Sequence, residues 1–154
     1  MRLILIRHGD AENAAVSDAA RALTEKGRQQ AERVGKFLRA SGVVPTHFLC
    51  SPYRRAVETA QGVAAHLGGE ITADRRLACG ARPATLQDIW RELDAPRDVV
   101  IVGHNPDCEE LTHYLTGAQT TFGKGTLVVI DLPDCRERAG ELLALVPAEM
   151  QGKV

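Results

Sequence analysis

The residues best suited to chemistry stand near the start of the chain, where Arg7, His8 and Gly9 follow the apolar run 3–6. A guanidinium offers a planar pair of N–H donors to an oxyanion, and an imidazole offers a nitrogen that can attack phosphorus. Glycine lets the backbone turn sharply and approach a ligand closely. This combination suits a phosphoryl group. The same three residues could equally cap a strand with polar groups, so they do not decide the function alone.

Arginines also follow a second apolar stretch. Ser51 and Pro52 are typical of a helix start, which puts Arg54 and Arg55 in the first helical turn, off the predicted core face. Both arginines could pair with Glu58 on a solvated surface, because it lies within one helical turn of each. Two cations at a helix N-terminus oppose the helix dipole, however, and favour an anion nearby. Periodicity does not choose between these interpretations.

A third stretch repeats the design of the first. The apolar run 99–102 ends in Gly103 and His104, and the asparagine and proline at 105–106 are typical of a helix start. His104 therefore stands, like His8, at the end of a strand that is expected to be buried on both faces.

The elements that must position these residues alternate between strands and helices. The expected strands are 3–6, 47–50, 70–72, 98–102, 126–132 and 141–146. The expected helices follow Thr24, Ser51, the loop 74–83 and Asn105, and the tail from Pro147 is expected to fray. This alternation predicts an α/β fold, a three-layer sandwich with a mostly parallel central sheet and helices on both faces.

In such a sheet the carboxyl ends of the strands meet along one edge, where ligands bind. Arg7 with His8, the segment 51–55, and His104 are therefore expected to converge there. Each junction delivers a cation or an imidazole, and three such coincidences favour a phosphate site over three unrelated caps. We expect neither a cofactor nor a metal ion, because the sequence has no carboxylate cluster of the magnesium type and no Walker loop.

Composition narrows the functional classes. A chain of 154 residues predicts one domain spanning 1–154, and a net charge of −1 without like-charge blocks argues against nucleic-acid binding. No stretch resembles a signal peptide or a membrane span, so we expect no membrane partner. The four scattered cysteines suggest a cytoplasmic protein. A zinc site made by Cys108 with His104 and His113 is disfavoured, because the spacing matches no structural zinc pattern.

Four motifs together resemble the histidine phosphatase superfamily, which has the phosphoglycerate mutase-like fold. They are Arg7-His8-Gly9, Leu23-Thr24-x-x-Gly27, Ser51-Pro52-x-x-Arg55-Ala56 with Thr59-Ala60, and Gly103-His104-Asn105-Pro106. They follow the family's order and lie between residues 3 and 106. The short chain and the segment 17–24 narrow the resemblance to the phosphohistidine phosphatases of the SixA type.

The resemblance implies a role for each matching residue. His8 matches the nucleophile that becomes phosphorylated, and Arg7, Arg55 and His104 match the groups that bind phosphoryl oxygens. To attack, His8 needs one nitrogen with a free lone pair, so its other nitrogen should donate to a fixed acceptor such as a backbone carbonyl. A protonated His104 would complete a clamp of three positive charges.

Other positions fit the family's pattern less closely. Arg21 is a candidate to reach the phosphate, with Asp18 orienting it, whereas Asn13 is out of step with the loop asparagine of the mutases. Larger members carry an acid glutamate in an inserted segment that is short here, and Glu70 and Glu92 are candidates only by elimination. A site without a proton donor suits an N-linked phosphate, because the imidazole leaves readily once it gains a proton from water.

Three functional hypotheses follow. The first is a metal-independent phosphatase that acts on phosphohistidine in a signalling or phosphotransfer protein, since short loops imply an open site that admits a protein. The second is a phosphomonoesterase for a small phosphorylated metabolite. The third is a phosphate-recognition module without turnover, which the presence of every motif residue argues against.

Overall fold

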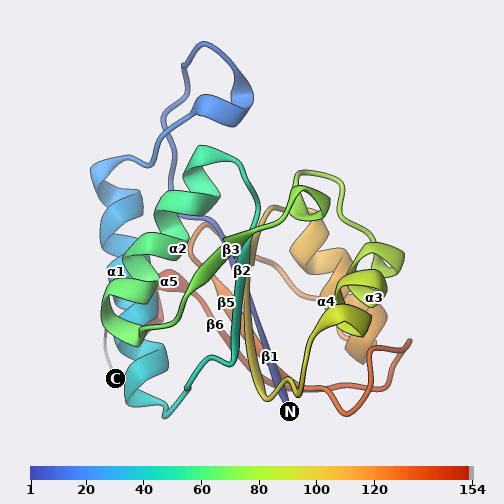
Figure 1. The fold of residues 1–154 in the computed structure, drawn as a ribbon. Helices are drawn as coiled ribbons and strands as arrows, with labels where there is room; N and C mark the ends of the chain where they lie inside the picture. Colours follow the sequence, from blue (N-terminus) through green and yellow to red (C-terminus); the bar gives the residue numbers. More distant parts are fainter. Residues whose placement is uncertain (153–154) are drawn as a thin grey trace.

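The computed structural model describes residues 1–152 and contains a six-stranded sheet between two layers of helices (Figure 1). The strands, in the order β3-β2-β4-β1-β5-β6, are β3 (Ile71–Ala73), β2 (His47–Cys50), β4 (Asp98–Gly103), β1 (Arg2–Arg7), β5 (Leu127–Asp131) and β6 (Glu141–Val146). The first four pair in parallel, whereas β5 is antiparallel to both of its neighbours. The predicted α/β fold with a mostly parallel sheet is confirmed.

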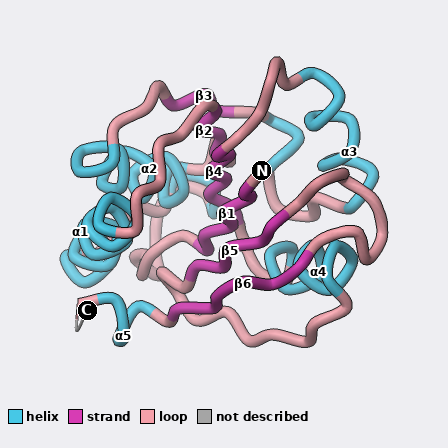
Figure 2. Tube along the Cα trace, turned by 90° about the horizontal axis from the view of Figure 1, so that it is seen from below, coloured by secondary structure: helices cyan, strands magenta, loops and turns pink. Residues whose placement is uncertain are grey.

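Helices cover both faces of the sheet, as Figure 2 shows. One face carries α1 (Glu25–Ala40), α2 (Arg54–Leu67) and α5 (Ala148–Gln151), and the other carries α3 (Pro83–Glu92) and α4 (Asp107–Thr116). Two short 3-10 helices lie at Asp18–Ala20 and Arg75–Leu77. Among the residues that the structure describes, no helix is long and apolar enough to cross a membrane.

Strand β1 lies at the centre because both of its faces are apolar. Ile4 and Ile6 pack into the core under α1 and α2, and Leu3 and Leu5 pack into the core under α3 and α4. All four side chains are buried, and burial of each contributes roughly 1.5–3 kcal/mol. The carboxyl end of β1 is therefore held firmly at the edge of the sheet. The segment between β1 and α1 rises above this edge (blue, top of Figure 1).

Two predicted helix starts are wrong. Helix α2 begins at Arg54 rather than at Pro52, and the buried Ser51 does not cap it. The Ser51 hydroxyl instead lies 2.7 Å from a ring nitrogen of His104. Helix α4 begins at Asp107 instead of at Pro106.

The predicted helix start at Thr24 is confirmed, since its hydroxyl accepts a hydrogen bond from Gly27 N. The prediction of a frayed tail is wrong for residues 147–152. Gln151 is buried and donates from Nε2 to the carbonyl oxygens of Gly125 and Val146, at 2.8 and 3.1 Å. A long amide side chain that finds two buried carbonyls fixes this segment. Residues 153–154 lie outside the described part.

Candidate active site

His8 lies directly beyond β1 and is only 6% exposed. Its Nδ1 is 2.7 Å from the carbonyl oxygen of Gly9. A carbonyl can only accept, so Nδ1 carries the proton and Nε2 presents its lone pair. Burial is the main reason that the pKa of His8 is lowered to about 3. The imidazole is therefore neutral at pH 7, with the unprotonated nitrogen that a nucleophile needs and the carbonyl partner that the sequence predicts.

Gly9 allows the chain to pass very close to α1. A Cβ added at Gly9 would lie 2.8 Å from the carbonyl oxygen of Gly27, and one at Gly27 would lie 2.1 Å from that of Asp10. Neither position accepts a larger residue without backbone movement. The Gly9 N–H donates to the Thr59 hydroxyl at 3.0 Å, and that hydroxyl in turn donates to Arg55 O at 2.7 Å. These contacts fix the turn after His8 against α1 and α2.

Arg55 reaches this turn from the first residues of α2. It is 4% exposed, and its Nε donates to His8 Nε2 at 3.3 Å. Its Nη1 and Nη2 donate to the backbone oxygen and the carboxylate of Asp18, at 2.8 and 3.2 Å. Arg54, by contrast, is exposed and lies 3.5 Å from Glu58. Arg54 thus makes the surface pair that one interpretation gives, and anion binding by Arg55 stays a prediction. The burial of Arg55 corrects the expectation that both arginines lie off the core.

His104 follows β4 and is 2% exposed. The ring centroids of His8 and His104 lie 5.3 Å apart, and the Tyr53 ring packs 5.0 Å from that of His104. Burial, followed by the Arg55 cation, lowers the pKa of His104 to about 4. His104 is therefore neutral at pH 7 in this structure, because a buried imidazole beside a guanidinium loses its proton. The protonated His104 of the expected clamp stays a prediction for the phosphate-bound site. Its Nδ1 has no hydrogen-bond partner within residues 1–152.

Arg7 is half-buried beside these groups, and its positive charge lowers the pKa of both His8 and His104. Its Nη1 donates to Phe122 O at 2.8 Å, while its buried Nε has no partner in the described chain. The structure thus brings Arg7, His8, Arg55 and His104 together at one edge, as the sequence predicts. A phosphoryl group there would meet one nucleophilic nitrogen and several N–H donors.

The predicted residues of the loop between β1 and α1 differ in their contacts. Asp18 bridges two arginines, because its carboxylate accepts from Arg21 Nε at 3.0 Å as well as from Arg55. Asp18 therefore contacts Arg21, while binding of phosphate by Arg21 stays a prediction. Asn13 is exposed. Among the described residues, no three His, Cys, Asp or Glu side chains gather in a way that could hold a metal ion.

Neither glutamate proposed by elimination reaches the site. Glu92 pairs with Arg76 at 2.8 Å on the surface, and Glu70 lines a cavity with Pro45 and His47, at the opposite end of β2. Sequence reasoning missed a different carboxylate, that of Asp107. It is 6% exposed, accepts from the Gly80 and Ala81 N–H groups, and has a pKa raised by burial.

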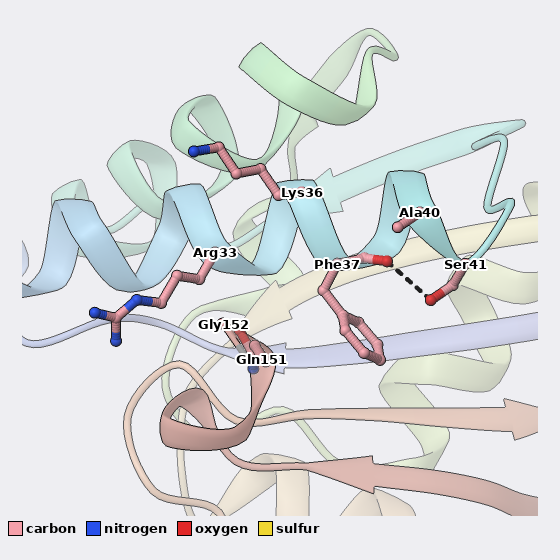
Figure 3. A pocket seen from close by; sticks show the side chains of 7 residues that line it. All are labelled: Arg33, Lys36, Phe37, Ala40, Ser41, Gln151 and Gly152. Atoms are coloured by element: carbon pink, nitrogen blue, oxygen red, sulfur yellow. Dashed lines mark hydrogen bonds between the residues drawn. The ribbon is translucent and has the colours of Figure 1, made fainter. Parts of the chain in front are cut away.

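Two cavities show where a ligand has room. One of about 310 Å³ adjoins the cluster, since it contains the residues next to His104 and the thiol 3.7 Å from Arg55 Nη2. Its lining residues are Cys79, Gly80, Arg82, Asn105, Pro106, Asp107 and Glu110. Another, of about 340 Å³, lies between α1 and α5 and contains none of the predicted site residues (Figure 3). Of these two cavities, the one of about 310 Å³ adjoins the predicted site residues.

Sequence reasoning also missed the partners of the two histidines. The sequence predicts Ser51 as a helix cap, yet Ser51 contacts His104. It marks Thr59 only as part of a motif, yet Thr59 holds Gly9, which follows His8. One signal could have found Thr59: it lies one helical turn after Arg55, so both share a helix face. No comparable signal marks Ser51, because serine before proline is a normal helix start.

Residues 3–78 match the family model of the histidine phosphatase superfamily (branch 1). A relative from Salmonella arizonae, named "Probable phosphoglycerate mutase GpmB", is 37% identical over 81 residues, which cover 50% of this chain and 37% of the relative. The matched region thus spans little more than a third of that relative's length.

Solved structures of low sequence identity share the fold over nearly the whole chain. The protein histidine phosphatase SixA in complex with tungstate superposes with a TM-score of 0.83 at 23% identity, covering 96% of this chain and 97% of that one. The alpha-ribazole phosphatase from Shigella flexneri superposes with a TM-score of 0.76 at 19% identity, covering 96% and 97%. The architecture is therefore common to proteins with different named substrates.

Proposed function

The chain belongs to the histidine phosphatase superfamily, and on that premise we propose that it is a phosphatase that works through a covalent phosphohistidine at His8. The observation that carries the proposal is the arrangement around His8 Nε2. This nitrogen is unprotonated, faces the Arg55 guanidinium at 3.3 Å, and belongs to a ring 5.3 Å from that of His104.

The reaction would proceed in two in-line steps. In the first, the His8 Nε2 lone pair forms a bond to phosphorus while the bond to the leaving group breaks, and the leaving group takes a proton from water. In the second, water attacks phosphorus, the bond to Nε2 breaks, and the proton released by water leaves with solvent or phosphate. Arg7, Arg55 and His104 would hold the phosphoryl oxygens throughout. Each such donor typically contributes about a hundred- to a thousandfold in rate.

His104 would change its protonation when substrate arrives. Its low pKa arises from burial and from neighbouring cations. A bound phosphoryl dianion offsets those cations and favours the imidazolium form. The clamp of three charges that the sequence suggests would then form only with the substrate in place. The neutral form of both imidazoles in the structure is consistent with this order of events.

We propose phosphohistidine in a signalling or phosphotransfer protein as the substrate. Neither Glu70 nor Glu92 can protonate a leaving group at His8, and an imidazole needs less help than an alkoxide. Asp18 is engaged with Arg21 and Arg55, so its carboxylate is occupied as an acceptor. The proposal includes a cytoplasmic location, supported by the four free cysteines.

One observation favours a second candidate function, a phosphomonoesterase for a small metabolite. The cavity of about 310 Å³ next to His104 has room for a compact organic group. The related folds include an enzyme named for a small phosphorylated substrate.

The test compares substrates and traps the intermediate. The protein is incubated with a chemically histidine-phosphorylated protein and with a panel of sugar and nucleotide phosphates, using ³²P. We expect faster turnover of the phosphohistidine protein and an acid-labile label that is lost in His8→Ala. His113→Ala is the matched control, because His113 is exposed on α4, and it should keep the label. Preference for the small esters would favour the second candidate, and anion binding without any labelling would indicate a recognition module.

A further inference from the structure

The position of Arg7 depends on the loop between α4 and β5. Phe122, in that loop, is 2% exposed, and its carbonyl oxygen accepts the Arg7 Nη1 bond at 2.8 Å. Farther along, Gly125 N donates to the carbonyl oxygens of Arg7 and His8, at 3.2 and 3.1 Å. Arg7 N in turn donates to Thr126 O at 3.0 Å. A displacement of this loop would therefore move the guanidinium.

A half-buried carboxylate holds the loop in place. Glu109 Oε1 accepts a hydrogen bond from Phe122 N at 3.3 Å, and its Oε2 accepts one from Asn105 Nδ2 at 2.6 Å. The Asn105 amide also lies 3.4 Å from Phe122 O, the same oxygen that Arg7 uses. Asn105 directly follows His104. One carboxylate thus ties the turn that carries His104 to the carbonyl that holds Arg7.

We infer that Glu109 is a positioning residue that sets the place of the Arg7 guanidinium relative to His104, and so tunes the affinity of the site for a phosphate-like oxyanion. The inference rests on the proposed function, because it assumes that Arg7 and His104 bind such an anion together.

A simpler role does not explain these contacts. Acidic residues in the first turn of a helix interact favourably with the helix dipole without needing a specific hydrogen-bond partner. Glu25 in α1 does this while exposed and paired with Arg28 at 3.2 Å. Glu109 instead turns both carboxylate oxygens to groups that hold the site. Hydrogen bonds to an ionised acceptor are roughly twice as strong as neutral ones, so a carboxylate suits the task better than an amide.

The experiment measures the binding of tungstate, a phosphate-like oxyanion, by calorimetry and as a competitive inhibitor of p-nitrophenyl phosphate hydrolysis. In Glu109→Gln we expect tungstate to bind about tenfold more weakly and KM to rise by a similar factor, with less change in kcat. The matched control is Glu25→Gln, which also removes one carboxylate from a first helical turn and should bind tungstate like the unaltered protein. Circular dichroism confirms that each variant is folded.

A double-mutant cycle separates positioning from a general loss of structure. If Glu109 acts through Arg7, then Glu109→Gln should have little further effect on tungstate binding in an Arg7→Ala background. Full additivity of the two changes would overturn the inference, as would unchanged tungstate affinity in Glu109→Gln. Failure of the proposed function looks different, since the unaltered protein itself would then form no His8 label, whether or not it binds tungstate.

Discussion

The ends of β1 and β4 look alike in sequence but differ in chemistry. The two strands are parallel neighbours, with Arg7 paired to Gly103, so the histidines that follow come to lie side by side. His8 bonds through Nδ1 to a backbone carbonyl, that of Gly9. His104 bonds through Nε2 to a hydroxyl, that of Ser51.

The difference lies in what each partner can do. A carbonyl only accepts, so it fixes the proton of neutral His8 on Nδ1 and leaves Nε2 with a free lone pair. A hydroxyl can donate or accept, so Ser51 tolerates His104 in its neutral and its protonated form. His8 thus has the form that the proposed attack needs, and His104 has a partner that suits the proposed binding of an anion. The histidines after β1 and β4 thus differ in chemistry because each has a different hydrogen-bond partner.

The largest expected effect comes from removing one imidazole at a time. His8→Ala should reduce phosphatase activity by more than about a thousandfold and abolish the phosphoryl label, because no other group replaces the nucleophile. His104→Ala should lose about a hundred- to a thousandfold but still become labelled, since only an oxyanion donor is missing. Steady-state rates and ³²P labelling measure both effects. A phosphoryl label retained in His8→Ala would show that His8, at the end of β1, is not the nucleophile.

Arg55 joins the two ends, and Arg54 provides its control. Arg55→Ala should reduce kcat/KM by about a hundred- to a thousandfold, because this buried guanidinium faces His8 Nε2 and borders His104. Arg54→Ala should change kcat/KM less than about twofold, since it removes only an exposed ion pair with Glu58. Equal losses of kcat/KM in the two variants would mean that Arg55 contributes only its positive charge and not its position beside His8.

The two ends should behave alike towards acid. Both histidines have folded-state pKa values, about 3 and about 4, that are below the ordinary 6.5. As the pH falls below 6.5, the unfolded chain gains protons that the folded chain does not, so stability decreases. Each histidine should cost on the order of 2 kcal/mol at pH 5 relative to pH 7. Urea denaturation at both pH values checks this, and His8→Asn or His104→Asn should each make the decrease smaller. A pH-independent stability would contradict both pKa values.

The smallest effect concerns the partner hydroxyl itself. Ser51→Ala removes the bonds of this hydroxyl to His104 Nε2 and to Tyr53 N without touching His8, and should lower kcat/KM about tenfold. It should also shift the acid limb of the pH profile, because the partner of His104 is changed, while the rate of His8 labelling at saturating substrate changes little. An equal decrease in kcat/KM and in the rate of His8 labelling would show that Ser51 stabilises the whole edge of the sheet rather than His104 alone.

Much of the fold was accessible from local pattern. Thr24 caps α1 as predicted, and 47–50 and 141–146 form strands with the predicted bounds. Apolar runs and capping residues act over a few positions, so the sequence displays them directly. The predictions that failed depend on distant partners. Ser51 contacts His104 instead of capping α2. Gln151 fixes, through its side-chain hydrogen bonds, a tail that the sequence predicts to fray.

By itself, the sequence determined the buried strands, the motifs at their ends and hence the edge at which four residues meet. It did so because strand burial and motif order are properties of short segments. The tertiary structure alone decided which distant groups hold those residues. Arg55 donates to His8 Nε2, Ser51 contacts His104, and Phe122 O accepts from Arg7, across 47, 53 and 115 positions. Such partners depend on strand register and helix placement, and these arise only when the whole chain packs.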